Sequence, residues 1–448
     1  MATGVSRRRV CVGAAGIASA GGSVASGLDV PSGQRASPGG RTTPATVTLW
    51  DGGSESYKRF LDAWLPGFQA EYPQVTLDQV PRPPDFAEKL IAAIAAGTPP
   101  DVVAVFGSWY RRLQEDKQVV PLDGFIKTSR LDVQDFLQGV YKWMKWQGQQ
   151  VGIPQYVNTN TVYYNRERFK QAGVPFPTDD WTADQFLETA RRLTRGPLPQ
   201  REVWGLYLPW GSIALRADSL LWGQCGSYNP PDDPNVFTFT TPQNVKAFQW
   251  LHDLAWRHRV GAVTADEMGG SGGYVLAGGR DPFFRTGTVA MLVDGTHLLA
   301  TYKTTAQTDW DVAALPKGPC GRGEYASVDG YVIPKGAKAP EAAWAVIQGL
   351  TGKEANRLRS EFLGLVPARK SQMDHWATTI PGKSLKSAVA SDAARPDSSA
   401  LWPRPTDVVA ALTPVWEALF VRNERTVPDA LKQMQDAIVG VLGPAAVR

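Results

Sequence analysis

The run Val102–Phe106 (VVAVF) is apolar without interruption, as expected of a parallel strand that is buried on both faces of its sheet. Two further β-type runs precede it, Thr46–Trp50 (TVTLW) and Val75–Val80 (VTLDQV). Between these two, aromatic residues recur at every fourth position over Phe60–Phe68, which is the stripe of an amphipathic helix. Strands that alternate with helices in this way predict an α/β fold.

The same alternation continues along the chain. Thr182 and Gln185 have the spacing of a capping box and predict the start of a helix. In open parallel sheets, ligands bind beyond the carboxyl ends of the strands. We therefore expect the site in the loops that begin at Asp51, Gly107, Asp294 and Asp329. The other strand-like runs are Thr161–Tyr164, Thr288–Val293, Asp311–Leu315 and Gly330–Ile333.

The charge of the chain is concentrated at its N-terminus. The 448 residues contain 47 Lys and Arg against 43 Asp and Glu, a net charge of +4. Residues 1–44 alone hold five Arg and one Asp, so the remaining chain nets zero. A dominant nucleic-acid or anionic-membrane surface is therefore not expected. The 16 Trp are many for a globular protein of this length.

The first residues have the features of an export signal. Ser6–Val12 contains three consecutive arginines followed by apolar residues, a twin-arginine pattern. The apolar stretch Val10–Ala20 is too short to span a bilayer, and Ser23–Ala25 offers small residues for cleavage. We expect residues 1–25 to be a twin-arginine-type signal and residues 26–45 to be a flexible linker. The alternative is a disordered basic arm. The mature protein is expected to be soluble.

Catalytic and cofactor motifs are weak. Gly269–Gly273 matches the G-x-S-x-G elbow by letter, but no apolar strand precedes it. His252 and His258 are six residues apart, which is not the spacing of a helical zinc pair. No dinucleotide or P-loop fingerprint is present. We therefore expect no catalytic residue, metal or cofactor, although a carboxylate pair for glycoside hydrolysis stays open.

Two cysteines, Cys225 and Cys320, remain after the signal. In an oxidising compartment they could form a disulfide. The alternative, which the sequence alone favours, is two separate small apolar residues.

Aromatic residues beside polar ones in predicted loops suggest a sugar site. They are Trp109, Tyr156 with Asn158, Trp210 and Trp222. A flat aromatic face packs on the C–H face of a pyranose, while polar groups bond its hydroxyls. The alternative for any single tryptophan is packing in the core.

A series of segments, in order from about residue 46 to 445, resembles the family 1 extracellular solute-binding proteins of ABC importers. Ala95–Val103 (AAGTPPDVV) is similar to a segment typical of that family. The other similar segments are Gly152–Pro154, Tyr163–Asn165 with Phe169, Phe284–Gly287 with Ala290 and Met291, Leu315–Pro316, Gly330–Pro334 and Gly364–Pro367.

The resemblance implies a periplasmic-binding-protein-like fold of type II, with two α/β lobes, crossover strands and a ligand cleft between them. One lobe would comprise 46–156 and 312–350, and the other 157–311 and 351–448. It also implies an extracytoplasmic, monomeric receptor that is not an enzyme. Such a receptor binds a sugar or oligosaccharide by lobe closure and delivers it to a membrane permease. A non-sugar solute, or a secreted carbohydrate-active hydrolase, is the alternative.

The resemblance also assigns ligand contacts by position. Many sugar binders have Trp near His297, so the His leaves the type of sugar open. The expected contacts are Asp51, Ser54 and Glu55 in the first loop, Ser108 and Trp109 in the second, Tyr156 and Asn158 at the first crossover, Trp210 in the second lobe, and Asp294, His297, Asp329 and Arg369.

Overall fold

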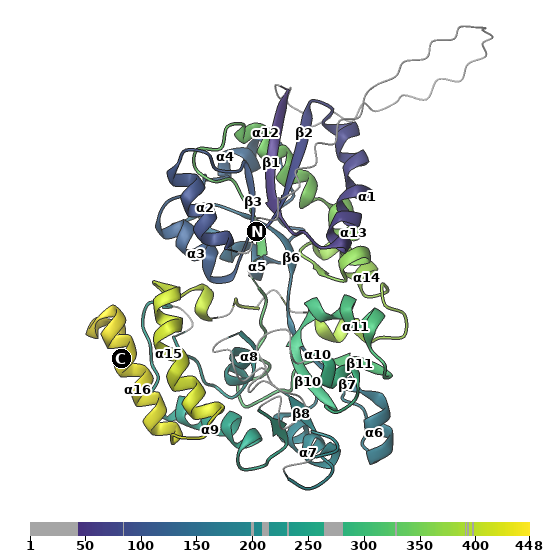
Figure 1. Ribbon diagram of the computed structural model, residues 1–448, viewed down its shortest axis with the longest axis vertical. Helices are drawn as coiled ribbons and strands as arrows, with labels where there is room; N and C mark the ends of the chain where they lie inside the picture. The colour runs from purple at the N-terminus through teal and green to yellow at the C-terminus, as the bar shows by residue number, and fades with distance from the viewer. Residues whose placement is uncertain are drawn as a thin grey trace, which may run out of the picture.

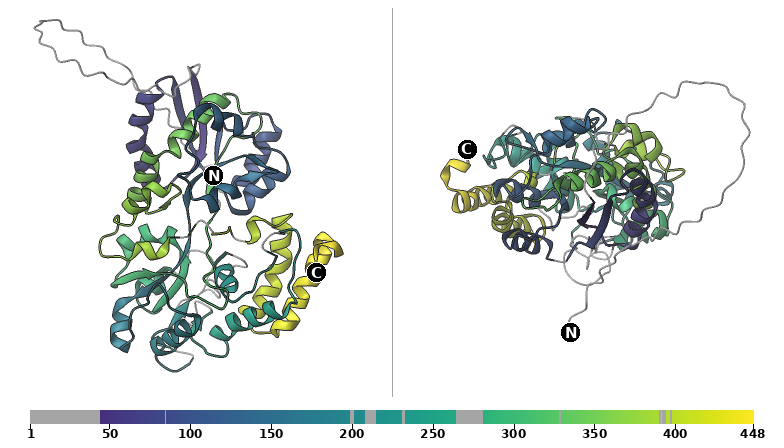
Figure 2. Two further views of the ribbon diagram at one scale, coloured as in Figure 1. Left: turned by 180° about the vertical axis from the view of Figure 1, so that it is seen from behind. Right: turned by 90° about the horizontal axis from the view of Figure 1, so that it is seen from above.

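The computed structural model describes residues 44–448, apart from 84, 199–200, 208–214, 231–232, 264–280, 328, 390, 392–393 and 397. These residues form two α/β lobes, one above the other along the long axis (Figure 1), and the view from behind shows the same two bodies (Figure 2). None of the described helices is both long and apolar enough to cross a bilayer. The expected signal, Trp210 and Gly269–Gly273 lie outside the described residues.

The first lobe is built on a six-stranded sheet of order β13-β6-β12-β3-β1-β2. Strand β1 pairs in parallel with β2 and β3, whereas β12 runs antiparallel to β3 and β6. Val102 to Val105 are fully buried, so the apolar run does form a parallel strand covered on both faces. The strands are β1 (Ala45–Asp51), β2 (Val75–Pro81), β3 (Val102–Phe106), β6 (Ile153–Val157), β12 (Asp329–Val332) and β13 (Val366–Pro367).

Helix α1 (Glu55–Glu71) shows why the flanking helices form. Ser54 caps it, because its Oγ accepts a hydrogen bond from Tyr57 N at 3.1 Å. Its buried face includes Phe60, Trp64 and Phe68, and it lies against α13. The other first-lobe elements are α2 (Phe86–Ala95), α3 (Gly107–Glu115), α4 (Asp123–Ser129), α5 (Gln138–Trp143), the hairpin β4 (Lys145–Trp146) and β5 (Gln149–Gln150), α12 (Pro340–Leu350) and α13 (Lys353–Leu363).

The second lobe holds a five-stranded sheet of order β11-β7-β10-β8-β9. The predicted capping box is present, since Thr182 and Gln185 exchange hydrogen bonds at the start of α7. The strands are β7 (Asn160–Asn165), β8 (Leu206–Tyr207), β9 (Gly261–Ala262), β10 (Met291–Gly295) and β11 (Trp310–Ala313). The helices are α6 (Arg166–Ala172), α7 (Ala183–Leu193), α8 (Leu215–Gly223), α9 (Pro242–Ala255), α10 (Asp281–Arg285), α11 (Leu299–Thr305), α15 (Pro405–Phe420) and α16 (Val427–Leu442).

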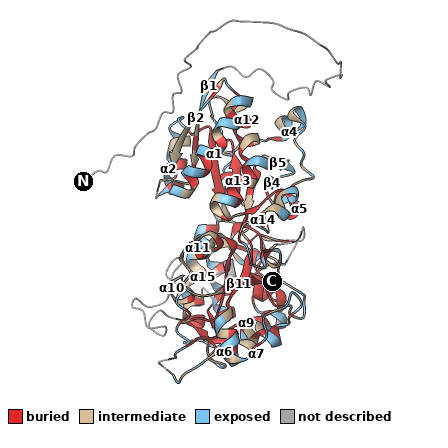
Figure 3. Cartoon of the chain, turned by 90° about the vertical axis from the view of Figure 1, so that its right-hand side faces the viewer, coloured by how far each residue is buried: buried red, intermediate tan, exposed pale blue. Residues whose placement is uncertain are grey.

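Burial follows this layered plan. The strands of both sheets are mostly buried, whereas the outer sides of the helices are exposed (Figure 3). Each lobe therefore buries its own sheet beneath helices, and the strand ends and loops are left to form the surfaces where the lobes meet.

The chain crosses between the lobes three times, and the structure places the second and third crossings elsewhere than expected. The first lies between β6 and β7, close to residue 157. The second lies between β11 and β12 rather than before 312, because β11 pairs with β7 in the second lobe. The third follows α14 (Met373–Trp376) rather than residue 350, because α13 packs on α1 and β13 pairs with β6 in the first lobe. The expected boundaries at 312 and 351 were therefore wrong.

Cys225 and Cys320 form a disulfide, with their Cα atoms 5.3 Å apart. The preference for two separate cysteines was wrong, because residues 95 positions apart meet only in the fold. The bridge joins the chain just after α8 to the connection between β11 and β12. It therefore fixes that connection, which links the two lobes, to the body of the second lobe.

Candidate ligand site between the lobes

Three expected residues gather at one edge of the first sheet. Asp51 ends β1, Asp329 begins β12, and Tyr156 lies near the end of β6. The Tyr156 hydroxyl donates to Asp329 Oδ1 at 3.2 Å. Burial raises the pKa of Tyr156 well above its usual value, and the charges of Asp329 and Asp51 raise it further. Tyr156 is thus a neutral hydrogen-bond donor at ordinary pH.

Asp51 is held in a buried network of its own lobe. Its Oδ2 accepts hydrogen bonds from the hydroxyls of Tyr57 and Tyr331, each at 2.5 Å. Arg82 lies 3.6 Å from its Oδ1, and Arg359 donates to Tyr331 at 3.0 Å. Sequence reasoning missed both as site residues: Tyr331 lies in the family-like segment Gly330–Pro334, which indicates only a strand, and Arg359 stands in no recognisable motif. The network joins β1, α1, β12 and α13, so its first role is to hold the rim of the site in shape.

Two expected residues lie at the start of α1. Ser54 is exposed and serves as the helix cap. The Glu55 side chain is 74% exposed, and its Oε2 lies 3.9 Å from Lys58 Nζ. The Ser54 hydroxyl is thus engaged by the backbone of buried Tyr57, whereas Glu55 is held only by an exposed ion pair and can adjust to a ligand.

Asn158 and His297 meet at the first crossover. Asn158 Oδ1 accepts from His297 N at 3.1 Å and from Thr296 Oγ1 at 3.3 Å. Ser327, from the second crossover, accepts from Asn158 N at 2.9 Å. Asp294 lies just before them at the end of β10, fully buried, and its Oδ1 accepts from Gly295 N at 2.6 Å. The expected polar residues of this region therefore meet where the chain crosses between the lobes, and we call this place the hinge.

Ser108 and Trp109 belong to the first turn of α3, directly after β3 as expected. Their side chains lie outside the described part of the structure, as does the whole of Trp210. Their assigned contacts remain predictions.

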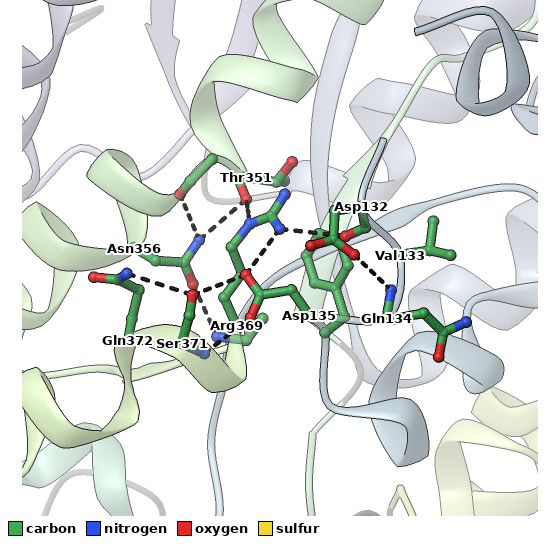
Figure 4. Close-up of polar contacts among 12 residues, drawn as sticks. Asp132, Val133, Gln134, Asp135, Thr351, Asn356, Arg369, Ser371 and Gln372 are labelled. Carbon is green, nitrogen blue, oxygen red and sulfur yellow. Dashed lines mark hydrogen bonds and ion pairs between the residues drawn. The ribbon is translucent and has the colours of Figure 1, made fainter. Parts of the chain in front are cut away.

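Arg369 has a different environment (Figure 4). Its Nε donates to Thr351 O at 2.6 Å, its Nη1 to Asp135 Oδ2 at 3.2 Å, and its guanidinium carbon lies 4.2 Å from the centre of the Phe136 ring. Ser371 N and Oγ bind the same carboxylate at 2.9 and 2.8 Å. Arg369 is only 4% exposed. Because protein groups already bind its guanidinium, we leave it out of the proposed site.

Two adjoining hollows separate the lobes beside α3. The larger, about 480 Å³ including its solvent-open part, lies between α3, α5 and β4 of the first lobe and Pro234, Ala400 and Leu401 of the second. The smaller, about 350 Å³, is lined mainly by the second lobe. Trp143, Pro234 and Leu401 line both hollows. We call the two together the interlobe cleft.

Four of the residues that line the interlobe cleft carry buried hydrogen-bond donors without a partner in the described structure. Gln114 Nε2 and the Nε1 atoms of Trp143, Trp146 and Trp222 are buried, and each is without a hydrogen-bond partner in the described structure. All four residues line the cleft. A buried donor left unpaired costs about 1–3 kcal/mol, so acceptor atoms of a ligand would relieve this cost. Two guanidinium groups also line the cleft. The guanidinium carbon of Arg111 lies 4.4 Å from the centre of the Trp146 ring, and that of Arg395 lies 4.0 Å from the centre of the Trp222 ring.

Sequence reasoning named Trp222 as a candidate but missed the others. Trp143 and Trp146 fall in the stretch KWMKW, where two tryptophans flanked by lysines could have marked a surface for binding. Gln114 and Arg395 gave no local signal. The described residues contain no group of three or more His, Cys, Asp and Glu side chains that could hold a metal ion.

Comparison with known proteins identifies the family of the chain. The family model described as bacterial extracellular solute-binding protein matches residues 51–357. A binding protein of Brucella abortus is 24% identical over 331 residues, 69% of this chain and 73% of its own length. An arabinooligosaccharide-binding protein of Halalkalibacterium halodurans is 23% identical over 179 residues, 39% of this chain and 37% of its own.

Solved structures give the same fold. An ABC substrate-binding protein of Listeria monocytogenes in complex with cycloalternan has a TM-score of 0.72 at 20% identity, over 90% of this chain and 100% of its own. UgpB of Mycobacterium tuberculosis in complex with glycerophosphocholine has a TM-score of 0.74 at 20% identity, over 89% and 98%. The expected two-lobed fold and the family resemblance are thus confirmed. Because the family model covers more than half of it, the chain belongs to the bacterial extracellular solute-binding proteins.

Proposed function

We propose that this protein is the substrate receptor of an ABC importer and that it binds a sugar or oligosaccharide between its lobes. The observation that carries the proposal is the set of four unpartnered donors, on Gln114, Trp143, Trp146 and Trp222, in one interlobe cleft. Saccharide hydroxyl and ring oxygens are acceptors, and indole faces pack on sugar rings. Closure of the lobes on the ligand would exclude water from these contacts.

The polar hinge supports binding by lobe movement. Asn158 is bonded both to Ser327 on the second crossover and to His297 in the second lobe. Rotation of one lobe against the other would bend the chain at these few residues. Tyr156 and Asp329, on the first-lobe rim, would then orient the ligand by hydrogen bonds.

The proposal includes export and delivery. The paired arginines of Ser6–Val12 support a twin-arginine signal, and the family supports work outside the cytoplasm with a membrane permease. The receptor would act as a monomer, with no nucleic-acid partner. Changing Arg7 and Arg8 to lysine keeps the charge and should block export of the precursor, measured by cell fractionation. Normal export of that variant would contradict the signal assignment.

Isothermal titration of the purified protein with neutral and acidic oligosaccharides tests the binding function. At 100 times its dissociation constant a true ligand adds about 2.7 kcal/mol to the stability of the folded state, which a thermal melt detects. The ligand should be recovered unchanged. Release of reducing ends in proportion to protein concentration would favour a hydrolase, and the absence of binding by any saccharide would overturn the proposal.

A further inference from the structure

Arg395 occupies a fixed place in the second-lobe wall of the interlobe cleft. Its backbone N donates to Glu324 O at 3.1 Å, and its carbonyl accepts from Ala326 N at 2.8 Å. These bonds fasten it to the connection between β11 and β12, which the Cys225–Cys320 disulfide also holds. The guanidinium carbon lies 4.0 Å from the centre of the Trp222 ring. The head group of Arg395 is thus positioned by its surroundings.

The guanidinium of Arg395 has no hydrogen-bonding partner among the described residues. Its guanidinium makes neither a hydrogen bond nor an ion pair with any described residue, although the side chain is half-buried and lines the smaller hollow. Burial lowers its pKa, and the charge of buried Asp218 opposes that shift. Asp218 is itself engaged, because its Oδ2 accepts from Ser398 N at 2.7 Å. Arginine stays protonated in proteins, so this wall carries a guanidinium whose N–H groups no described residue accepts, although the buried Asp218 carboxylate acts on it through its charge.

A stacked arginine in this cleft can also be paired with a carboxylate, as Arg111 on the opposite wall shows. It also lies over an indole, that of Trp146, but its Nε donates to Glu115 Oε1 at 2.8 Å. The Arg82 guanidinium likewise lies 3.6 Å from Asp51. A charge removed from water without a partner is costly. Of the two stacked arginines in the cleft, Arg395 is the one whose guanidinium N–H groups are not bonded to any described residue.

We propose that the ligand carries an anionic group, a carboxylate or a phosphate, which Arg395 binds while the adjoining sugar or polyol contacts the cleft tryptophans. The planar guanidinium matches the two oxygens of either group and binds them in a bidentate manner. Trp222 Nε1, a buried unpartnered donor beside it, would add a hydrogen bond to the same end of the ligand. The inference rests on the proposed function, since it names the ligand class of the same cleft.

Acidic ligands are compared with their neutral counterparts. Trigalacturonate is titrated against its methyl ester, and glucose 1-phosphate against glucose, by calorimetry at fixed ionic strength. The acidic member of at least one pair should bind ten-fold or more tightly, and the pair that shows the difference identifies the anion as carboxylate or phosphate. Arg395→Gln should remove this preference, whereas Arg395→Lys should retain part of it. Arg357→Gln, at a half-buried first-lobe arginine that lines neither hollow, changes the net charge equally and should leave the preference intact.

A thermal melt of each variant without ligand verifies that it is folded, and affinity for the neutral ligands reports on the rest of the cleft. Equal or tighter binding of the neutral members overturns the anion inference and leaves the proposed receptor function standing. An unchanged acid preference in Arg395→Gln also overturns it. If neither these probes nor any other saccharide binds, the proposed function fails and this inference fails with it.

Discussion

The hydroxyl of Tyr331 donates a 2.5 Å hydrogen bond to Asp51 across 280 residues of sequence. It joins the end of β1 to β12, the strand by which the chain re-enters the first lobe. Arg359 of α13 donates to the same Tyr331 hydroxyl. The rim of the first lobe therefore acquires its shape only when the chain has returned from the second, and binding-site geometry is coupled to folding of the whole protein.

Changing Tyr331 to Phe tests this coupling. The variant keeps the ring but leaves the buried Asp51 carboxylate with one donor fewer and Arg359 without one of its acceptors. We expect a loss of about 1–3 kcal/mol in the free energy of unfolding, measured by urea melts. Tyr72→Phe, whose hydroxyl lies beside exposed Glu71, is the matched control and should change stability by less than about 0.5 kcal/mol. Equal effects of the two would show that the network carries no special stability.

Stability should fall at high pH because several phenols are buried. Burial is the main cause that raises the pKa of Tyr57, Tyr156 and Tyr331 above the usual 10.0. Below pH 10 these groups are protonated in both states, so their contribution is fully present. Above it the unfolded chain releases protons that the folded chain retains, and each such tyrosine lowers stability by about 1.4 kcal/mol per pH unit.

Urea melts between pH 9 and 11, followed by circular dichroism, measure this slope. Tyr331→Phe removes one of the groups, so its stability should fall less steeply than that of the wild type. Parallel slopes would mean that Tyr331 ionises equally in both states and would contradict its buried, hydrogen-bonded position.

Local patterns predicted the elements of this fold because each depends on near neighbours in sequence. The buried run Val102–Phe106 and the Thr182 cap are of this kind, and the rule for parallel sheets then placed Asp51 at the carboxyl end of β1. Asp329 lies on the same rim for another reason, because it begins β12, which runs antiparallel to β3. The cleft is different: Trp143 and Arg395 line one hollow although 252 positions separate them, and they meet only after three crossings between the lobes. No local signal specifies that meeting, or the pairing of Arg369 with Asp135 that makes this arginine structural.

Removing the disulfide should destabilise the second lobe. In the double variant Cys225→Ser with Cys320→Ser, the unfolded chain gains the freedom that a cross-link over 95 residues had removed. We expect a loss of about 2–4 kcal/mol in urea melts. Reduction of the wild type should give a similar loss and should not affect the serine variant. A thiol assay that finds both cysteines free in the unreduced protein would contradict the bridge.

The Nε1–H of Trp143 should contribute to affinity without contributing to the stability of the ligand-free protein. Trp143→Phe keeps an aromatic face but removes a buried donor that has no partner in the described structure. A ligand that accepts from this donor should therefore bind about five- to ten-fold more weakly, since 1.4 kcal/mol is a factor of ten. The melting temperature without ligand should change little, because loss of the unpaired donor offsets the packing that the smaller ring gives up.

Trp344 offers a matched control for this substitution. Its Nε1 is also buried without a described partner, but its ring packs on Phe125 at 5.7 Å in the first lobe and it lines neither hollow. Trp344→Phe should therefore leave affinity unchanged in the same titration. If Trp344→Phe weakens binding as much as Trp143→Phe, the effect is one of general packing. If Trp143→Phe binds every ligand of the wild type with equal affinity, its donor faces no ligand atom, and the contacts must be sought at Tyr156, Asn158 and the hinge instead.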